Sequence, residues 1–324
     1  MRTVQELSEV VERGILELSF PDEPKNLYDP IRYALASGGK RLRPVLTLAA
    51  CNLFSDAVEQ ALYPSLAVEV FHNFTLIHDD IMDNALLRRN QPTVFAKWNA
   101  NTAILSGDVM CVHAYQLLAK SNGRHMDQLL QVFNTIAQCV CEGQQYDMDF
   151  ETSAFVTEQE YIHMIEMKTA ALLQGALQLG AIVAEAPQPE VTNIGEFGRN
   201  LGIAFQLQDD LLDAYGDAKR FGKRIGGDII TNKKTFLAVK AFSLAKGNTL
   251  NLLDSYFKAP NMDPESKVEG VIKIYNELGI KSLTENEIAK YYGLATQALA
   301  RIECQPNRKV LIESLAHTVM NRTS

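Results

Sequence analysis

The chain has 324 residues, of which 47% are hydrophobic and 22% charged, so it can bury a sizeable core and is not of the disordered class. Its net charge is −8 and it contains no block of basic residues, which argues against a nucleic acid partner. No apolar run reaches the length of a transmembrane helix, and the first residues carry acids and no apolar signal core, so we expect a cytoplasmic protein.

The five cysteines are scattered through apolar runs, and their number is odd. They are Cys51, Cys111, Cys139, Cys141 and Cys304. Only Cys139 and Cys141 lie close in sequence, at a spacing that differs from the usual zinc-binding pairs. We therefore expect buried, reduced thiols, as in a cytoplasmic protein.

Apolar residues recur at intervals of three and four almost throughout the chain, which is the helical period. Leu66, Val70, Phe74, Ile77 and Ile81 are one example. Alternating strand patterns are missing, and Gly and Pro cluster only at short breaks. There is no internal repeat and no linker, so the pattern predicts one all-α domain over residues 1–324 with about a dozen helices.

A long helix is predicted over about 64–85, and its last turns carry Asp79, Asp80 and Asp83 in "LIHDDIMDN". Asp79 and Asp83 are four residues apart and share a face of the helix. Like charges at this spacing repel each other unless a cation lies between them. The motif therefore predicts a cation-binding site.

A second long helix is predicted over about 194–215, and its end, "FQLQDDLLDAYGD", repeats the acidic spacing with Asp209, Asp210 and Asp213. Two copies of D-D-x-x-D at helix ends predict that the carboxylates gather at one end of a bundle. Carboxylate oxygens suit Mg²⁺, which keeps several waters and shares its coordination shell with substrate phosphates. We predict Mg²⁺ as the cofactor of this site.

Several short groups of cations could complete a site for a phosphate-containing substrate. They are Lys40, Arg41 and Arg43 in "GGKRLRP", Arg88 and Arg89 in "LRRNQPT", Lys168 beside Thr169 in "MKTA", and Lys223, Arg224, Lys233 and Lys234 in "GKRIGGDIITNKKT". The two glycines of "GGKRLRP" can bring backbone N–H groups close to an anion. Surface charge is the alternative for each group. Lys168 differs, because a single lysine in an apolar helix either extends to solvent or meets an anion.

Two Glu-x-x-His pairs offer another interpretation, since this is the ligand pattern of di-iron carboxylate bundles. The pairs are Glu69 with His72 and Glu160 with His163. This alternative leaves both aspartate motifs without a role and needs two further glutamates that the sequence does not identify. A metal-dependent phosphohydrolase using His78 and Asp79 is a third interpretation, but its remaining histidine ligands have no clear candidates.

Taken in order, these motifs resemble those of the trans-isoprenyl diphosphate synthases, also called polyprenyl synthetases. The resemblance is carried by "GGKRLRP", "VFHNFTLIHDDIMDNALLRRNQPT", "MKTA", "FQLQDDLLD" and "GKRIGGDIITNKKT". It implies the isoprenoid synthase type I fold, in which helices surround a deep apolar cavity. It also implies a Mg²⁺-dependent prenyltransferase that condenses isopentenyl diphosphate with allylic diphosphates by ionisation, condensation and elimination. Members are usually homodimers, and the helix in "AILSGDVMCVHAYQLLA" could supply an interface.

The resemblance also implies roles for the candidate residues. The implied Mg²⁺ ligands are Asp79, Asp83 and Asp209, with Asp80, Asp210 and Asp213 as ligands or as supports for ligands. The residues implied to hold the allylic diphosphate are Arg88, Lys168, Lys223 and Lys233. Those implied to hold the diphosphate of isopentenyl diphosphate are Lys40, Arg43, His72 and Arg89. Thr169 and Gln206 match positions whose oxygens face the carbocation. We class both residues as catalytic. The same class contains the three implied Mg²⁺ ligands and the four residues implied to hold the allylic diphosphate.

Product length in this family depends on residues about one turn before the first aspartate motif, because the chain grows down the cavity from there. These residues are Thr75 and Phe74, with Phe71 a further turn away. An aromatic ring five residues before Asp79 favours a short product of C15 to C20, and a longer polyprenyl product is the alternative. The chain departs from the family pattern at Asn90, where Gly usually follows the arginine pair, and many bacterial short-chain enzymes have four residues, not two, between these aspartates.

Overall fold

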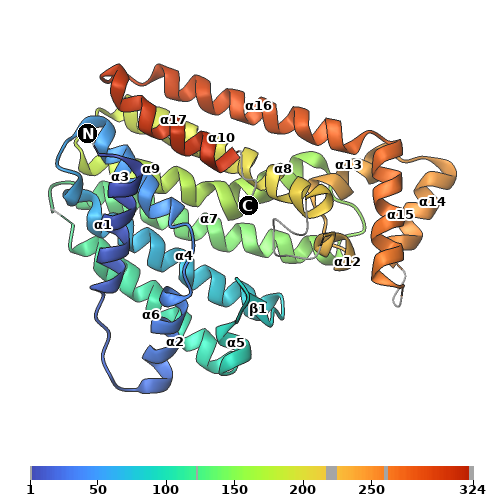
Figure 1. The fold of residues 1–324 in the computed structure, drawn as a ribbon, viewed down its shortest axis with the longest axis horizontal. Coiled ribbons are helices and arrows are strands. Elements are labelled where there is room, and N and C mark those ends of the chain that lie inside the picture. Colours follow the sequence, from blue (N-terminus) through green and yellow to red (C-terminus); the bar gives the residue numbers. More distant parts are fainter. Residues whose placement is uncertain (1, 122, 217–224, 259–261, 321–324) are drawn as a thin grey trace. The chain divides into compact units, whose positions relative to one another are not determined.

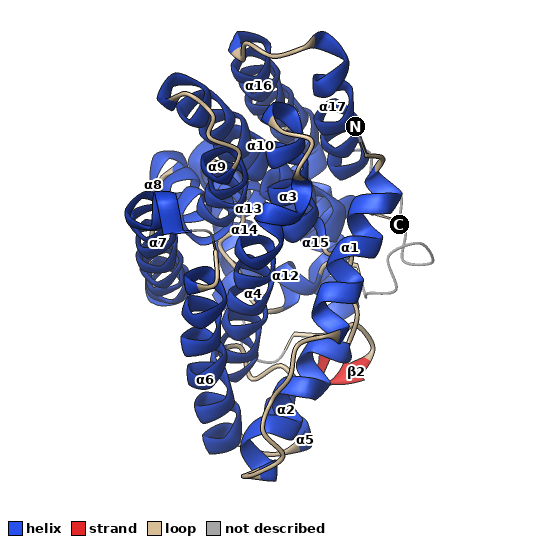
Figure 2. Ribbon diagram, turned by 90° about the vertical axis from the view of Figure 1, so that its left-hand side faces the viewer, coloured by secondary structure: helices blue, strands red, loops and turns tan. Residues whose placement is uncertain are grey.

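The computed structural model describes residues 2–121, 123–216, 225–258 and 262–320. Nearly all regular structure in these residues is helical, with one two-stranded hairpin as the exception (Figure 2). This confirms the all-α fold class. None of the described helices combines the length and the apolar content that crossing a bilayer requires.

The elements of the first half of the chain are α1 (Val4–Leu16), α2 (Lys25–Ala36), α3 (Leu42–Phe54), η1 (Val58–Ala61), α4 (Leu62–Met82), β1 (Leu87–Arg88), β2 (Gln91–Pro92), α5 (Val94–Lys97), α6 (Ala100–Ala119), η2 (Gly123–His125) and α7 (Met126–Thr152). Those of the second half are α8 (Glu158–Ile165), η3 (Glu166–Ala170), α9 (Ala171–Val183), α10 (Gln188–Tyr215), α12 (Gly227–Ile230), α13 (Phe236–Leu244), α14 (Gly247–Lys258), α15 (Pro264–Glu277), α16 (Ile280–Arg301) and α17 (Pro306–Met320). Residue contacts divide the chain into two compact units. The first comprises Met1–Thr135, Gly175–Gly195 and Ile302–Leu315, and the second comprises Ile136–Gln174, Glu196–Arg301 and Ala316–Ser324.

The helix α4 is central to the first unit. It packs along α6 and also contacts α1, α2 and α3 (Figure 1). Its middle is apolar on nearly every face, and residues such as Leu66, Val70 and Phe71 are fully enclosed. The helix ends at Met82, three residues before the predicted end, because Asn84 adopts a left-handed conformation with φ of 50°.

A tight hairpin follows α4 and carries the arginine pair. In the hairpin, Leu87 pairs with Pro92 and Arg88 pairs with Gln91. The two residues between the strands, Arg89 and Asn90, both have positive φ, of 53° and 60°, as a two-residue hairpin turn requires. Asn90 therefore occupies a conformation that Asn tolerates better than most residues, which accounts for the departure from Gly. The sequence pattern missed these strands because two residues are too few to show alternation.

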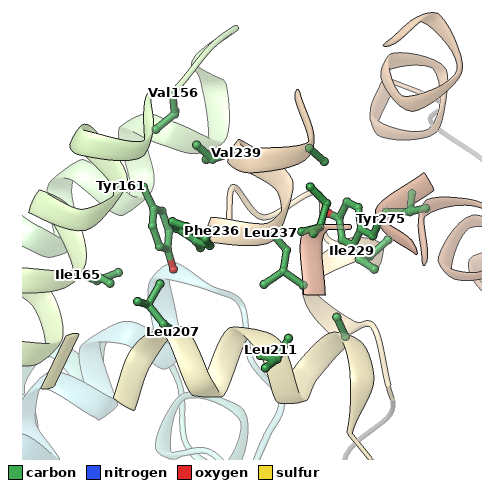
Figure 3. Packing of buried hydrophobic residues seen from close by; sticks show 14 of the residues in the cluster. Val156, Tyr161, Ile165, Leu207, Leu211, Ile229, Phe236, Leu237, Val239 and Tyr275 are labelled. Carbon is green, nitrogen blue, oxygen red and sulfur yellow. The ribbon is translucent and has the colours of Figure 1, made fainter. Parts of the chain in front are cut away.

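The second unit has its own apolar core, formed along the C-terminal half of α10. Figure 3 shows the ring of Tyr161 from α8 beside Phe236 from α13, with Leu207 of α10 near Tyr161 and Leu211 below Leu237. Tyr275 of α15 belongs to the same cluster. The second acidic motif therefore lies on a helix whose other side is fixed by packing.

The segment η3 is a single π-helical turn between α8 and α9. It carries Lys168 and Thr169, which the sequence placed in an ordinary helix. A Cβ atom at Gly143 of α7 would lie 2.3 Å from the backbone nitrogen of Lys168, and one at Gly202 of α10 would lie 2.6 Å from Cα of Ala170. Only glycine allows α7 and α10 to approach the π-helical turn this closely. Turns of this kind are frequent at functional sites.

Candidate active site

The first acidic motif lies at the carboxyl end of α4, and its three aspartates differ in exposure. Asp80 is only 4% exposed, Asp79 is half-buried and Asp83 is exposed. The guanidinium of Arg88 donates to Oδ1 of Asp80 from both Nε and Nη2, each at 2.8 Å. Burial raises the pKa of Asp80, and the bonds and charge of Arg88 act against this rise. Asp80 therefore fixes Arg88, while Asp79 and Asp83 present carboxylates nearer the surface.

A group of cations lies beside this motif in the first unit. Nη1 of Arg43 is 3.1 Å from Nε2 of His72. Burial and the charges of Arg43 and Arg89 hold the pKa of His72 well below its ordinary value of 6.5. Arginine can only donate, so Nε2 of the neutral ring accepts, and Nδ1 carries the proton. The ring thus supplies an N–H donor without adding charge to a cationic group.

The glycines of "GGKRLRP" bring this loop and the hairpin together. Gly38 and Gly39 have φ of 74° and 134°, and the carbonyl of Gly38 accepts a hydrogen bond from Nη1 of Arg89. A Cβ at Gly39 would lie 2.7 Å from the same nitrogen, so a side chain would displace the guanidinium. Lys40 is exposed beside them. The structure thus joins two segments that lie about 50 residues apart in the sequence.

The next residue of the loop, Arg41, has an inward, structural position. It is 6% exposed, and its Nη1 lies 2.6 Å from Oε1 of Glu69. Nδ2 of Asn73 donates to the same oxygen at 3.0 Å. This buried ion pair fixes the loop at its junction with α3. It also occupies a carboxylate that the di-iron alternative requires as a metal ligand.

The second acidic motif, at the end of α10, also has a buried middle aspartate, but its first aspartate is the exposed one. Asp209 is exposed, Asp210 is 4% exposed and Asp213 is half-buried. Asp210 accepts hydrogen bonds from Nε2 of Gln206 at 3.1 Å, from the backbone N–H of Phe236 at 3.2 Å, and from the hydroxyl of Tyr161. Burial, with a contribution from the negative charge of Asp228, raises its pKa to about 7 despite these three donors. Asp213 in turn accepts from the backbone N–H of Asp228 at 3.0 Å and so anchors the start of α12.

Thr169 and Gln206, the two polar residues predicted to face a carbocation, are in direct contact. The hydroxyl of Thr169 donates to Oε1 of Gln206 at 2.9 Å, and Gln206 donates onward to Asp210. A chain of hydrogen bonds thus runs from the π-helical turn to the second acidic motif. Because each dipole is fixed by its neighbour, the chain is preorganised and needs no reorientation.

Two of the predicted lysines share one carboxylate, which the sequence analysis missed. Nζ of Lys168 lies 2.5 Å from Oδ2 of Asp147, and Nζ of Lys233 lies 3.8 Å from the same atom. Burial acts to raise the pKa of Asp147, but the two lysines outweigh it and hold this pKa below its ordinary value. In the sequence Asp147 resembles a surface acid, as its exposed neighbour Asp149 is. Nothing in its spacing points to Lys168, which is 21 residues away.

Each unit presents carboxylates of the ligand type that a hard divalent cation prefers. Within the described residues, no group of three or more His, Cys, Asp or Glu side chains is arranged so that it could hold a metal ion. Mg²⁺ commonly takes only one or two carboxylates and completes its shell with water and phosphate oxygens. Asp79, Asp83 and Asp209 offer such oxygens at accessible positions.

Comparison with known proteins decides between the interpretations. A family model described as polyprenyl synthetase matches residues 24–275. The chain belongs to the polyprenyl synthetase family. As a polyprenyl synthetase, it is a short-chain prenyltransferase, and its relatives support this function. The di-iron alternative is not favoured, because Glu69 is paired with Arg41 and because Glu160 caps the start of α8 through Thr157.

Three known proteins illustrate the similarity of this polyprenyl synthetase to its relatives. It is 38% identical to the geranylgeranyl diphosphate synthase of Sulfolobus acidocaldarius, over 87% of this chain and 86% of that protein. It is 35% identical to the geranylfarnesyl diphosphate synthase of Natronomonas pharaonis, over 74% of this chain and 75% of that protein. A crystal structure of a geranylgeranyl pyrophosphate synthase is 41% identical, with a TM-score of 0.95 and full coverage of both chains.

The residues predicted to set product length in this polyprenyl synthetase lie in an aromatic cluster. Phe71 is buried, with its ring centroid 5.3 Å from that of Phe74 and 5.4 Å from that of Phe133. Phe74 is only half-buried and also contacts the ring of His78 at 4.7 Å. The hydroxyl of Thr75 donates to the carbonyl of His72 at 2.8 Å. Phe71 therefore supports Phe74 from within the core.

The predicted site residues thus fall into defined groups within each unit. In the first unit, Arg43 with His72, Arg88 with Asp80, and Arg89 with the glycine loop are in contact. In the second unit, Lys168 and Lys233 meet at Asp147, and Thr169 meets Gln206. Lys223 and Arg224 lie outside the described residues.

Proposed function

We propose that this polyprenyl synthetase is a Mg²⁺-dependent geranylgeranyl diphosphate synthase. It adds isopentenyl diphosphate to allylic diphosphates and releases an all-trans C20 diphosphate. The observation that carries the proposal is the likeness, over the full length of both chains, to a solved geranylgeranyl pyrophosphate synthase. The Sulfolobus acidocaldarius relative of the same name supports it.

In the proposed site Asp79, Asp83 and Asp209 hold Mg²⁺. Their oxygens are the ligand type that Mg²⁺ prefers, and their exposure leaves room for water and phosphate in the coordination shell. When bound, the metal takes up negative charge that develops on the diphosphate as the allylic C–O bond breaks. Asp80 and Asp210 are held by protein donors and support the helix ends.

The diphosphate of the allylic substrate is bound by Arg88, Lys168 and Lys233, with Lys223 as a further predicted cation. The ion pairs with Asp147 hold both described lysines in place before substrate arrives. These cations stabilise the leaving group most strongly when it carries its full charge, so they favour the ionised state over the bound substrate.

Isopentenyl diphosphate is bound by Lys40, Arg43, His72 and Arg89. The neutral ring of His72 is fixed by Arg43, so the two act together as donors. No metal is needed where the cations are this dense. The Arg41–Glu69 ion pair keeps the loop that carries Lys40 in a fixed conformation.

Thr169 and Gln206 stabilise the carbocation through their dipoles. Their hydrogen-bonded oxygens offer partial negative charge without a strong nucleophile that would capture the cation. The double bond of isopentenyl diphosphate attacks the cation, and a proton then leaves the tertiary cation to the departing diphosphate. No side-chain base is required, because the departing diphosphate accepts the proton.

Product analysis tests the proposal directly. The purified protein is incubated with Mg²⁺, isopentenyl diphosphate and either dimethylallyl, geranyl or farnesyl diphosphate, and the chains are sized by chromatography. We expect mainly C20 product, and no product when EDTA replaces Mg²⁺. A main product well beyond C20 would favour the longer-chain alternative. Absence of any condensation with all three starters would overturn the proposed function.

Phe74 is proposed to stop chain growth. The substitution Phe74→Ala removes a ring that packs against Phe71, so longer products should appear. Tyr63→Ala, on the first turn of the same helix and 41% exposed, is the matched control and should leave the C20 product unchanged. An unchanged product length in Phe74→Ala would remove this role from Phe74.

The chain is further proposed to act as a homodimer of single polyprenyl synthetase domains spanning residues 1–324. Three large apolar side chains of α6, namely Ile104, Leu105 and Val112, are 42%, 58% and 58% exposed. A second copy of the chain would bury them. Light scattering should give a dimer for the wild type and a smaller species for Leu105→Asp. The cytoplasmic location stays a prediction.

A further inference from the structure

The second unit contains a pocket that the proposed reaction does not use. It lies between the segment after α7, the start of α13 and the end of α14. Its volume is about 230 Å³, many times the roughly 10–15 Å³ that a single water molecule needs. It is therefore large enough for a small organic molecule. The residues that characterise it are Phe155, Lys234, Val239, Phe242, Phe257 and Lys258.

One wall of the pocket is aromatic. The rings of Phe242 and Phe257 meet edge to face, with centroids 5.1 Å apart. Phe155, which is 61% exposed, lines the same pocket. Val239 continues the apolar surface along α13. An apolar group in the pocket would cover this surface, and removing both apolar surfaces from water would favour binding.

The lining of the pocket also includes two lysines, Lys234 and Lys258. Lys258 is paired with Asp254, with 2.8 Å between Nζ and the carboxylate. Lys234 has no ion pair or hydrogen bond in the part of the chain that the structure describes, and burial lowers its pKa. A half-buried ammonium group without a counter-charge is best satisfied by an anion. The lining therefore carries one net positive charge.

The pocket lies next in sequence to residues of the candidate active site. Lys233 contacts Asp147, whereas its neighbour Lys234 lines the pocket. Two residues further on, the backbone N–H of Phe236 donates to Asp210. Between them, the side chain of Thr235 caps the start of α13. An anion bound to Lys234 would therefore contact a short segment that is anchored at Thr235 and Phe236 and that also carries Lys233.

We propose that this pocket is an effector site for a small organic phosphate with an apolar body, which binds through Lys234 and the aromatic wall and alters the contribution of Lys233 to the reaction. The anionic head meets the ammonium group, and the apolar body covers Phe155 and Phe242. The effect on the reaction rests on the role proposed for Lys233, whereas the binding does not. The two parts can therefore be tested separately.

Binding is tested by calorimetric titration of the full chain with phenyl phosphate in EDTA, which removes metal-dependent binding. The wild type should bind phenyl phosphate more tightly than inorganic phosphate, because only the former covers the aromatic wall. Lys234→Gln should weaken binding by at least about tenfold, since it removes a charged hydrogen bond. Phe155→Ala should weaken it about threefold. Lys246→Gln, an exposed lysine elsewhere in the same unit, is the matched control and should bind as the wild type does.

Equal affinity in the wild type and Lys234→Gln, or equal affinity for phenyl and inorganic phosphate, would overturn the proposed site. The effector role is tested by measuring KM for the allylic diphosphate with and without phenyl phosphate. KM should change in the wild type and stay constant in Lys234→Gln. If phenyl phosphate binds but changes KM equally in the wild type and in Lys234→Gln, the proposed effect on Lys233 is wrong. The proposed prenyltransferase activity would be unaffected by that result.

Discussion

The two D-D-x-x-D motifs have identical spacing, yet they stabilise their buried middle aspartate in different ways. Asp80 is paired with the guanidinium of Arg88, so that one charge neutralises another. Asp210 receives only uncharged donors, from Tyr161, Gln206 and a backbone N–H at the start of α13. Burial raises its pKa to about 7. One motif therefore depends on an ion pair and the other on a hydrogen-bond network.

This comparison separates structural from ligand-binding roles within each motif. In both, the middle aspartate is almost fully buried and bound by the protein, whereas an outer aspartate is accessible. A carboxylate that already accepts several hydrogen bonds has little capacity left for a metal. This difference supports Asp79, Asp83 and Asp209 as the proposed metal ligands, and experiment can test that proposal.

The largest effect is expected from the accessible aspartates. Asp79→Asn and Asp209→Asn should each lower kcat/KM by roughly 10²–10³-fold, the range found when one preorganised electrostatic group is lost from a transition state. Thermal unfolding should change little, because neither side chain is buried in the core. Glu313→Gln, an exposed acid on α17, is the control for loss of one negative charge. Activity near the wild-type level in both variants would end the metal assignment.

A large effect on stability is expected where the hydrogen-bond network is cut. Tyr161→Phe removes one donor from Asp210 and leaves a buried carboxylate under-satisfied, which should lower the free energy of unfolding by about 1–3 kcal/mol. Because the lost partner is uncharged, the loss should be the same at low and high salt in urea titrations. Tyr146→Phe, on an exposed tyrosine of α7, is the control. A stability equal to the wild type would mean that the hydroxyl is not needed to hold Asp210.

The sequence was sufficient for those features that depend on local pattern. Helical periodicity predicted the all-α fold, and the repeated spacing identified both aspartate motifs before any coordinate was known. The end of α4 was predicted three residues too late, since a left-handed Asn84 has no strong signal in an apolar pattern. The π-helical turn was missed because its residues continue the same apolar pattern as the flanking helices.

Contacts between distant residues could not be predicted in the same way. The pairing of Asp147 with Lys168 and Lys233 depends on Gly143, which allows α7 to touch the π-helical turn. Nor does spacing distinguish Asp80 from Asp210, whose partners come from a hairpin and from α8 and α13. The spacing of residues in the sequence predicts which side chains share a face of a helix. Tertiary packing determines which of these side chains is paired, and whether its partner is an ion or an uncharged donor.

A smaller effect is expected from pH in the charged region of the first unit. The folded protein holds the pKa of His72 well below 6.5, whereas the unfolded chain binds a proton near 6.5. As the pH falls below about 6.5, His72 gains its proton in the unfolded state before it does so in the folded state. The free energy of unfolding therefore falls, by up to about 1.4 kcal/mol per pH unit. His72→Gln should flatten the pH dependence of unfolding between pH 5 and 7 relative to the wild type, and His317→Gln, an exposed histidine on α17, should not. Parallel curves for wild type and His72→Gln would contradict the neutral state of His72.

The smallest effect is expected from the ion pair between Arg88 and Asp80 in the first motif. The Arg88 side chain is 36% exposed, so solvent screens the pair, and Arg88→Met should lower the free energy of unfolding by only about 1 kcal/mol. High salt should weaken the pair in the wild type and so reduce the difference, unlike the salt-independent loss in Tyr161→Phe. Adding Asp80→Asn to Arg88→Met should recover part of the loss, because it removes the buried charge left unpaired. A salt-independent loss in Arg88→Met with no recovery in the double variant would show that both middle aspartates are held in the same way.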